Sequence, residues 1–491
     1  MSIIILRIIL SVACVMIKIN NYSMNEVRVL GVNLFWFRRD LRIDDNQALY
    51  HCVVERDQVL PFFILDPAEL NGRSLQEPRM RFLMENLRHL KEQLEQHGST
   101  LYVFKGSPVS VFQRIVEQVA VKGVFFNRNY EPAEIERDRQ IWQLCHSKGI
   151  EVQTFKDLVL HERGEILKKD KKPYTVFTYY FNQWQQLKKD AQKSVQAIKT
   201  VRFESIPNET LPSLSGLIRF DPKKELDLFL SDKINVYDVH RDYPFLDGTS
   251  RLSAFLRTGW LSVREVYHSA SNLLERADSK AINAIEQFIR QLAWRDFYYQ
   301  IMYHFPFVEN ESFLQKFRTI KWENNDLLFT KWCEGLTGVP IVDAGMRQLN
   351  SQGWMHNRLR MITASFLTKD LLIDWKWGER YFKHRLIDYD MPLNNGGWQW
   401  CASTGTDAQP YFRIFNPYTQ SKKFDPQGDF IKRYIPELNG CPKKYIHEPY
   451  LMPIDEQRAS NCLIGQTYPA PIVDHSQQRI KALNMYKRPE G

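Results

Sequence analysis

The chain has 491 residues, more than one ordinary hydrophobic core can hold, so its length predicts two large domains. Hydrophobic residues make up 44% of the sequence and charged residues 25%, which is typical of a soluble globular protein and excludes a largely disordered, collagen-like or solenoid chain. The formal net charge of +9 at pH 7 favours a polyanionic partner or cofactor.

The seven cysteines form no C-x-x-C pair and no zinc-binding spacing, and their odd number argues against a closed set of disulfides. We therefore expect a cytoplasmic protein without a metal site. Residues 1–27 are predicted to be an extension outside the folded core. Their apolar run resembles a short signal sequence, but Arg7 interrupts it and no small-residue cleavage site follows. We favour a translated upstream extension over a membrane anchor, with Met1 or Met24 as the start.

Residues 28–160 alternate short apolar runs with longer amphipathic segments. Strands are predicted at 29–37, 58–65, 101–104, 123–127 and 150–155, with helices between them. This alternation is typical of βαβ units, so we predict an α/β domain with a doubly wound parallel sheet. No glycine fingerprint for nucleotide binding follows the strands, and any ligand of this domain is expected at their carboxyl ends.

Residues 161–219 carry scattered Lys and Pro with weak periodicity and are predicted to form a connection over the surface. Strand signals are absent from residues 220–485, and helical periodicity predicts an all-α second domain. Nine of the twelve tryptophans fall between Trp260 and Trp400. Core packing explains any one of them, but the set, interleaved with Arg and Asn, suggests a further role.

Two groups in the helical half suit a large polar ligand. The hydroxyls and backbone amides of residues 249–253 lie at a predicted helix start, where they would bind phosphate or simply cap the helix. Arg360 supplies a cation, and the two acidic residues within 388–390 supply carboxylates that we expect to be buried.

Two further groups suit flat ligands. The sequence NNGGWQW, residues 394–400, predicts a glycine-bent turn that a flat ligand can approach closely. Gln291 and Trp294 share one face of a predicted helix, and Asn357 and Met361 share one face of another.

The strings TSRLS, WRDF, GWMHNRLRM, DYD, NNGGWQWCASTGTDAQPYFRIFNP and HEPY resemble the photolyase/cryptochrome family. GWMHNRLRM and NNGGWQW are most similar to class I cyclobutane pyrimidine dimer DNA photolyases. The resemblance covers about Val32 to Arg479. It implies an α/β antenna domain, a helical domain that binds one FAD, and light-driven repair of UV-damaged DNA by a deoxyribodipyrimidine photo-lyase.

The resemblance implies a set of FAD-binding residues: Tyr237, Thr249, Ser250, Arg251, Leu252, Ser253, Phe288, Arg360, Asp388, Tyr389, Asp390 and Asn394. Arg360 would pair with Asp388, and Asn394 would face flavin N5. Because an amide cannot hand over a proton as a carboxylic acid can, we expect the active cofactor to be fully reduced FAD. Trp398, Trp375 and Trp322 would relay electrons from the surface to the flavin.

The resemblance also implies a set of residues that bind the lesion and its DNA: Arg241, Gln291, Trp294, Arg295, Asn357, Arg358, Met361, Trp400 and Arg413. The dimer would be turned out of the duplex, because photolyases belong to the enzymes that flip their target bases. Arginines at the pocket mouth would hold phosphates, and the two tryptophans would stack on the bases. We expect a monomer with no membrane association and no obligate protein partner.

Two positions leave alternatives open. Gln291 stands where most similar class I enzymes have Glu, and Gln also occurs there in (6-4) photolyases and cryptochrome-type blue-light receptors. Those relatives carry a histidine pair where this chain has only His356, so we favour the cyclobutane dimer. A flavin-binding single-strand binder is a further alternative.

The antenna is the second open position. Glu134 matches a residue that binds 5,10-methenyltetrahydrofolate in relatives, but Ser74, Ala133, Val308 and Glu309 replace the family's other polar partners. The sequence leaves three alternatives open, namely this folate, another antenna or none.

Overall fold

The computed structural model describes residues 31–54, 58–70, 74, 77–195, 198, 208–211 and 220–487. The extension predicted at residues 1–27, with both candidate start residues, lies outside the described residues. Among the described residues, no helix is long and apolar enough to cross a membrane.

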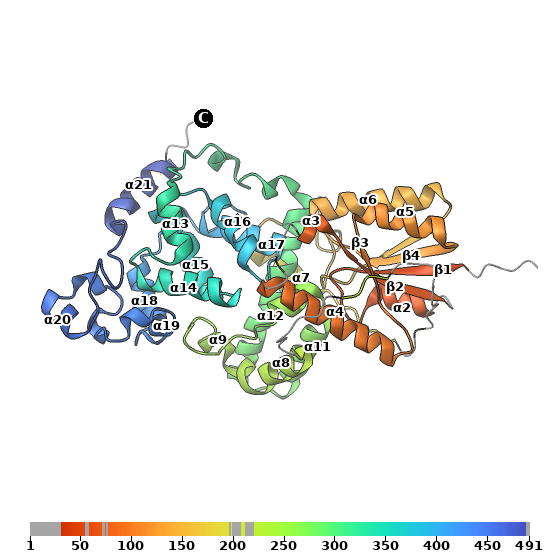
Figure 1. Ribbon diagram of the computed structural model, residues 1–491, viewed down its shortest axis with the longest axis horizontal. Coiled ribbons are helices and arrows are strands. Elements are labelled where there is room, and N and C mark those ends of the chain that lie inside the picture. Colours follow the sequence, from red (N-terminus) through yellow and green to blue (C-terminus); the bar gives the residue numbers. More distant parts are fainter. Residues whose placement is uncertain are drawn as a thin grey trace, which may run out of the picture.

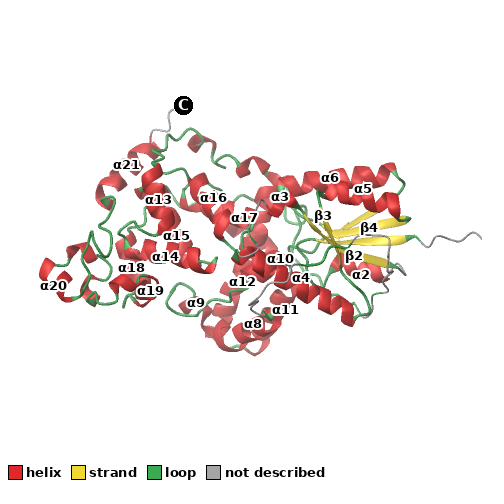
Figure 2. Cartoon of the chain, in the orientation of Figure 1, coloured by secondary structure: helices red, strands yellow, loops and turns green. Residues whose placement is uncertain are grey.

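The N-terminal part contains a five-stranded sheet whose strands are all parallel, as the sequence predicts (Figure 2). The strand order is β3-β2-β1-β4-β5. Its strands are β1 (Val32–Phe37), β2 (Val59–Leu65), β3 (Tyr102–Lys105), β4 (Val121–Asn127) and β5 (Glu151–Phe155). Its helices are α2 (Gln47–Val54), α3 (Pro67–Leu70), α4 (Pro78–Gln96), α5 (Pro108–Gln118) and α6 (Pro132–Ser147). Proline at the first position suits α4, α5 and α6 because its missing N–H would have no helical partner there.

Both faces of this sheet are covered by helices. Phe35 and Phe37 of β1 pack with residues of α2 and α4, whereas Leu34 and Trp36 pack with residues of α5 and α6. Figure 1 shows α2 and α4 on one side of the sheet and α5 and α6 on the other. All six residues of β1 are buried, which explains why a central parallel strand appears as an unbroken apolar run in the sequence. The strand order reverses between β1 and β4, so the residues after β1 lie at the crevice where such sheets bind ligands.

The rest of the described chain is helical. Its α-helices up to residue 304 are α7 (Phe177–Gln186), α8 (Pro222–Leu228), α9 (Tyr237–His240), α10 (Ser253–Thr258), α11 (Val263–Asn272) and α12 (Ser279–His304). Those that follow are α13 (Asp326–Glu334), α14 (Pro340–Gln352), α15 (Asn357–Ser365), α16 (Trp375–Arg385), α17 (Met391–Cys401), α18 (Pro417–Phe424), α19 (Asp429–Tyr434), α20 (Ile454–Ala459) and α21 (His475–Lys487). The long helix α12 packs against α7, α9, α11 and α17 and forms the centre of this part (Figure 1).

Two sequence predictions about local structure are wrong. The segment predicted as a surface connection contains α7, whose Phe177, Tyr180, Phe181 and Trp184 are buried in the core around α12. The predicted glycine-bent turn is the helix α17. Its Gly396 is needed for packing instead, because a Cβ there would lie 2.2 Å from the ring of Tyr298.

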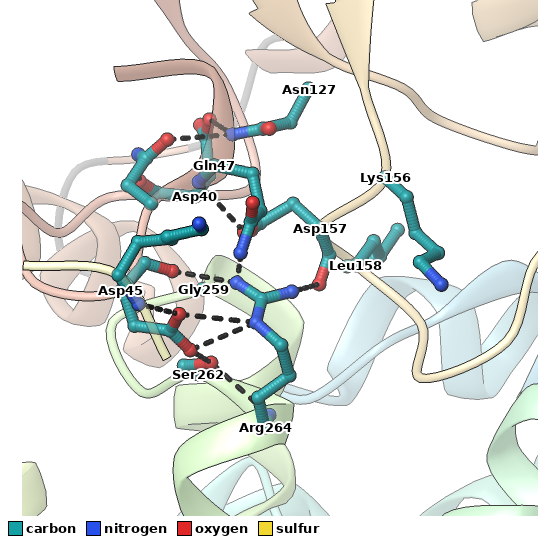
Figure 3. A network of polar contacts seen from close by, with 12 residues as sticks. Asp40, Asp45, Gln47, Asn127, Lys156, Asp157, Leu158, Gly259, Ser262 and Arg264 are labelled. Atoms are coloured by element: carbon teal, nitrogen blue, oxygen red, sulfur yellow. Dashed lines mark hydrogen bonds and ion pairs between the residues drawn. The ribbon is translucent and has the colours of Figure 1, made fainter. Parts of the chain in front are cut away.

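A buried ion network joins the two parts (Figure 3). Arg264 of α11 pairs with Asp45, which follows β1, at 3.0 Å and with Asp157, which follows β5, at 2.6 Å. Arg42 adds a second pair with Asp157 at 2.7 Å. Burial would raise the pKa of Asp157, but Arg42 and Arg264 outweigh it and lower that pKa. These buried ion pairs therefore connect the residues that follow β1 and β5 to helix α11.

Replacing Arg264 with Met keeps most of the side-chain length but leaves the buried Asp45 without its cation and Asp157 with Arg42 alone. We expect Arg264→Met to lower the free energy of unfolding by about 3–5 kcal/mol in urea denaturation. Lys223→Met is the matched control, because the Lys223–Asp44 pair bridges the same two parts with side chains 58% and 54% exposed. Its loss should cost less than about 1 kcal/mol. Equal losses in the two variants would contradict this account.

Candidate cofactor and DNA-binding site

Most of the predicted cofactor and lesion residues lie on α9, α12, α15 and α17, on the segment before α10 or just before α17. Helix α12 packs against α9 and α17, and α15 packs against α17. Tyr237 of α9 and Phe288 of α12 are both buried, with their rings edge-on at 5.5 Å. Burial raises the pKa of Tyr237 to about 12, so its hydroxyl stays protonated. The structure thus brings together these two residues, which are distant in sequence.

The predicted phosphate segment, Thr249 to Leu252, directly precedes α10, which begins at Ser253. Arg251 has a positive φ of 53°, an uncommon conformation for a non-glycine residue, and it pairs with Asp247 at 3.2 Å. Its guanidinium also lies over the ring of Trp354, with the centroid 4.8 Å away. The segment is thereby tied to the residues just before α15.

The predicted pair of Arg360 and Asp388 is present, with Arg360 Nη2 donating to Asp388 Oδ2 at 2.8 Å. Asn394 donates its amide N–H groups to the backbone and side-chain oxygens of Glu379 at 3.2 Å and 2.9 Å. This orientation leaves the Oδ1 atom of Asn394 as the end of the amide that can accept a hydrogen bond from a ligand.

Asp390, which is predicted to line the cofactor, also contacts the α/β part. Its Oδ2 accepts hydrogen bonds from Arg39 at 3.0 Å and from Tyr299 at 2.7 Å, and Arg39 also donates to Glu131 at 2.5 Å. Burial would raise the pKa of Asp390, but Arg39 and then Arg295 lower it, so the carboxylate is charged. One oxygen of Asp390 therefore binds the α/β part, and only Oδ1 remains for a ligand.

Several buried polar atoms around these residues lack a hydrogen-bond partner in the described part of the chain. They are Arg241 Nη1, His356 Nε2, Arg358 Nε, Asp388 Oδ1, Tyr389 OH and Asp390 Oδ1. A buried donor or acceptor without a partner is costly, and native proteins satisfy nearly all of them. Both donors and acceptors are present, which fits a ligand with phosphates, hydroxyls and ring N–H groups such as FAD.

The three tryptophans predicted to relay electrons belong to one core. Trp375 and Trp398 are buried where α16 packs against α17, and Trp322 packs at the edge of the same cluster. The Trp322 ring lies edge-on to that of Tyr486 at 6.0 Å. Trp375 and Trp398 are thus buried, and Trp322 is partly exposed.

Four of the predicted lesion residues, Gln291, Trp294, Asn357 and Met361, lie on α12 and α15 as expected. Asn357 Nδ2 is 3.9 Å from Met361 Sδ on α15. Gln291 donates its amide N–H to Gln287 O one turn back on α12, at 3.1 Å, which leaves its Oε1 as an acceptor. Trp294 is stacked on Phe177 of α7, with centroids 3.7 Å apart and planes at 8°. Sequence reasoning missed Phe177 because it lies in the segment predicted as a connection.

The predicted phosphate-binding role of Arg295 is wrong. Its side chain is only 5% exposed, donates to the backbone oxygen of Leu158 and lies over the ring of Tyr299. Arg413 is exposed as expected. Arg358 pairs with Asp242 at 2.8 Å and Arg241 is partly exposed. Trp400 is partly buried on α17.

Glu134, the predicted antenna residue, lies in the first turn of α6 and is 4.0 Å from Arg39. Burial would raise its pKa, but Arg137 and then Arg39 lower it. Its Oε2 has no hydrogen-bond partner in the described residues. Glu134 thus belongs to the charged cluster between the two parts of the chain, and no antenna follows from this arrangement.

The fold and site define a parallel α/β unit joined to a helical cofactor-binding unit. Residues 33–199 match the family model described as DNA photolyase, and residues 288–488 match that described as FAD binding domain of DNA photolyase. The Deoxyribodipyrimidine photo-lyase of Alkalihalophilus pseudofirmus is 40% identical over 475 residues, which cover 92% of this chain and 97% of that protein.

Two solved structures are similar over nearly the whole chain. A bacterial class III photolyase from Agrobacterium tumefaciens is 34% identical with a TM-score of 0.87, covering 94% of this chain and 98% of its own. A cryptochrome from Synechocystis sp. is 27% identical with a TM-score of 0.84, covering 93% and 99%. The chain belongs to the DNA photolyase family and carries its FAD-binding domain.

His356 provides a pH test of the site. Burial lowers its pKa to about 4, with Asp242 opposing the shift and Arg358 and Arg360 adding to it. The unfolded state then binds more protons between about pH 6.5 and about pH 4, so stability is lost as the pH falls through this window. We expect the flavin-free protein to lose about 3 kcal/mol more than His356→Asn in urea denaturation across it. Parallel pH profiles for the two proteins would contradict the burial of a neutral imidazole.

Proposed function

We propose that this protein repairs cyclobutane pyrimidine dimers in DNA by light-driven electron transfer from reduced FAD. The observation that carries the proposal is the meeting of α12, α15 and α17, which present the predicted lesion residues beside the predicted cofactor residues. The relatives named deoxyribodipyrimidine photo-lyase support the same substrate.

The lesion would be bound by aromatic rings and by a side-chain amide. Phe177 covers one face of Trp294, so a flipped base would stack on the opposite face, which is worth roughly 1–3 kcal/mol per base. Trp400 of α17 would offer a second stacking surface. Asn357, which is exposed at the start of α15, would donate its amide to the pyrimidine edge.

Within the site, FAD bound in its reduced form supplies the electron that splits the dimer under light. The protein's residues would bind the cofactor and set the hydrogen bonds and charges around it. Asn394, fixed by Glu379, would accept a hydrogen bond at the flavin edge. Arg360 and Asp388 form a pair beside it whose second carboxylate oxygen remains for the cofactor. Trp398, Trp375 and Trp322 would return the resting cofactor to its reduced form.

The second candidate is a (6-4) photolyase or a blue-light receptor, because Gln291 occurs in both and the Synechocystis cryptochrome shares the fold. His356 disfavours the (6-4) chemistry. Its Nδ1 accepts from the backbone N–H of Arg358, and a pKa of about 4 leaves the ring neutral near pH 7, so it carries no imidazolium proton to donate. Its helix neighbours on the lesion face are Asn357 and Met361 rather than a second histidine.

Removing a stacking surface should weaken recognition of the lesion. We expect Trp400→Ala to bind dimer-containing duplex about 5- to 150-fold less tightly in a gel-shift titration, because one base loses its stacking partner. Trp142→Ala, on α6 and 49% exposed, is the control and should bind as the wild type. An unchanged affinity of Trp400→Ala would remove Trp400 from the lesion site.

The electron relay and the repair reaction can be separated. In Trp398→Phe, we expect light to fail to reduce oxidised FAD, because phenylalanine is far harder to oxidise. The same variant reduced in the dark should still restore thymines in dimer-containing duplex under blue light. Trp377→Phe should behave as the wild type in both assays.

Failure of the reduced wild type to repair cyclobutane dimers, with repair of (6-4) photoproducts instead, would establish the second candidate. No light-dependent repair of either lesion would favour the receptor. Normal photoreduction in Trp398→Phe would contradict the relay.

A further inference from the structure

The two imidazole nitrogens of His356 differ in their hydrogen bonding. Nδ1 accepts a hydrogen bond from the backbone N–H of Arg358 at 3.2 Å and so caps the first turn of α15. Because Nδ1 is an acceptor, the proton of the neutral ring lies on Nε2. Nε2 is buried and has no hydrogen-bond partner in the described part of the chain, and His356 is 2% exposed.

The surroundings of the ring come from two segments of the predicted cofactor site. The charged groups that act on His356 are Asp242, Arg358, Arg360 and Arg251. Asp242 precedes the predicted phosphate segment and Arg251 belongs to it, whereas Arg358 and Arg360 belong to α15. The ring of Trp354, 6.4 Å from that of His356, contacts Arg251. His356 therefore lies between the predicted phosphate segment and the start of α15.

These groups favour an anionic acceptor for the Nε2 proton. The three arginines are each paired with a different carboxylate, Asp247, Asp242 and Asp388, and in the described part of the chain none of these carboxylates accepts a hydrogen bond from His356. The first turn of α15 contains no acidic residue. The partial positive charge of a helix N-terminus attracts phosphate oxygens, and nine residues of helix stand behind this one.

We propose that His356 binds FAD by donating a hydrogen bond from Nε2 to a diphosphate oxygen of the cofactor. The proposal rests on FAD binding in the proposed function and does not depend on DNA repair. One imidazole then joins the cofactor to α15, the helix that carries Asn357 and Met361. Binding of the cofactor would thus fix the start of the helix that faces the lesion.

Two substitutions separate the roles of the two nitrogens. In His356→Asn, the amide oxygen can replace Nδ1 as the helix cap, since Asn is among the best capping residues, but nothing replaces Nε2. In His356→Gln, the longer side chain places an N–H near the position of Nε2 and gives up the cap. His356→Asn should therefore keep its stability but bind FAD less tightly, whereas His356→Gln should lose stability but keep its affinity for FAD.

The experiment follows release of FAD from the purified holoprotein in the dark, by recovery of free-flavin fluorescence after dilution. We expect His356→Asn to bind FAD ~10- to 100-fold less tightly than the wild type, the effect of losing a hydrogen bond to a charged oxygen. His356→Gln should stay within about threefold of the wild type, the difference expected from an imperfect donor position. His447→Asn is the control, because His447 is a buried histidine bonded to Ser421 elsewhere in the helical part.

ADP distinguishes the diphosphate from the flavin half. As a competitor of FAD rebinding, it should lose affinity in His356→Asn by the same factor as FAD. A loss for FAD without a loss for ADP would overturn the assignment to the diphosphate, and wild-type FAD release from His356→Asn would overturn the proposal. Absence of dimer repair in a wild type that still shows these FAD differences would reject the proposed function alone.

Discussion

The arrangement of the site depends on the hydrogen bonds of Arg39. This residue follows β1, at the crevice where the strand order of the sheet reverses. Its guanidinium donates to Glu131 of the α/β part and to Asp390 of the helical part. Arg39 is 7% exposed, so these charges interact with little screening by water. Removing one of these three charged side chains would leave a buried charge without its partner.

Asp390 transmits this contact to the site because it is the N-cap residue of α17. Its side chain makes no capping hydrogen bond with the helix, since Arg39 and Tyr299 bind the carboxylate instead. Helix α17 carries Asn394, Trp398 and Trp400, the residues assigned to the flavin edge, the relay and the lesion. The charged pair of Arg39 and Asp390 at the boundary therefore holds the start of the helix that carries all three of these residues.

The sequence predicts the sheet well because its strands are continuous apolar runs between prolines that begin helices. It also predicts Arg360 with Asp388 and the shared helix faces of α12 and α15, the latter because helical spacing alone brings residues three or four apart together. The turn at NNGGWQW is predicted wrongly because Gly396 serves contact with Tyr298, a residue about a hundred positions away. Arg295 and Phe177 escape prediction for the same reason: Arg295 contacts Leu158 and Phe177 stacks on Trp294, in each case a residue distant in the sequence.

If Arg39 positions α17, and with it the flavin surroundings, its replacement should change the environment of the bound cofactor. The direct measurement is the visible circular dichroism of bound FAD in Arg39→Lys, which keeps the cation but cannot donate to Glu131 and Asp390 from one planar group. Arg128→Lys, whose arginine pairs with Glu162 within the α/β part, is the comparison. We expect an altered flavin spectrum in Arg39→Lys and an unaltered one in Arg128→Lys. A wild-type flavin spectrum in Arg39→Lys would contradict the central role of Arg39.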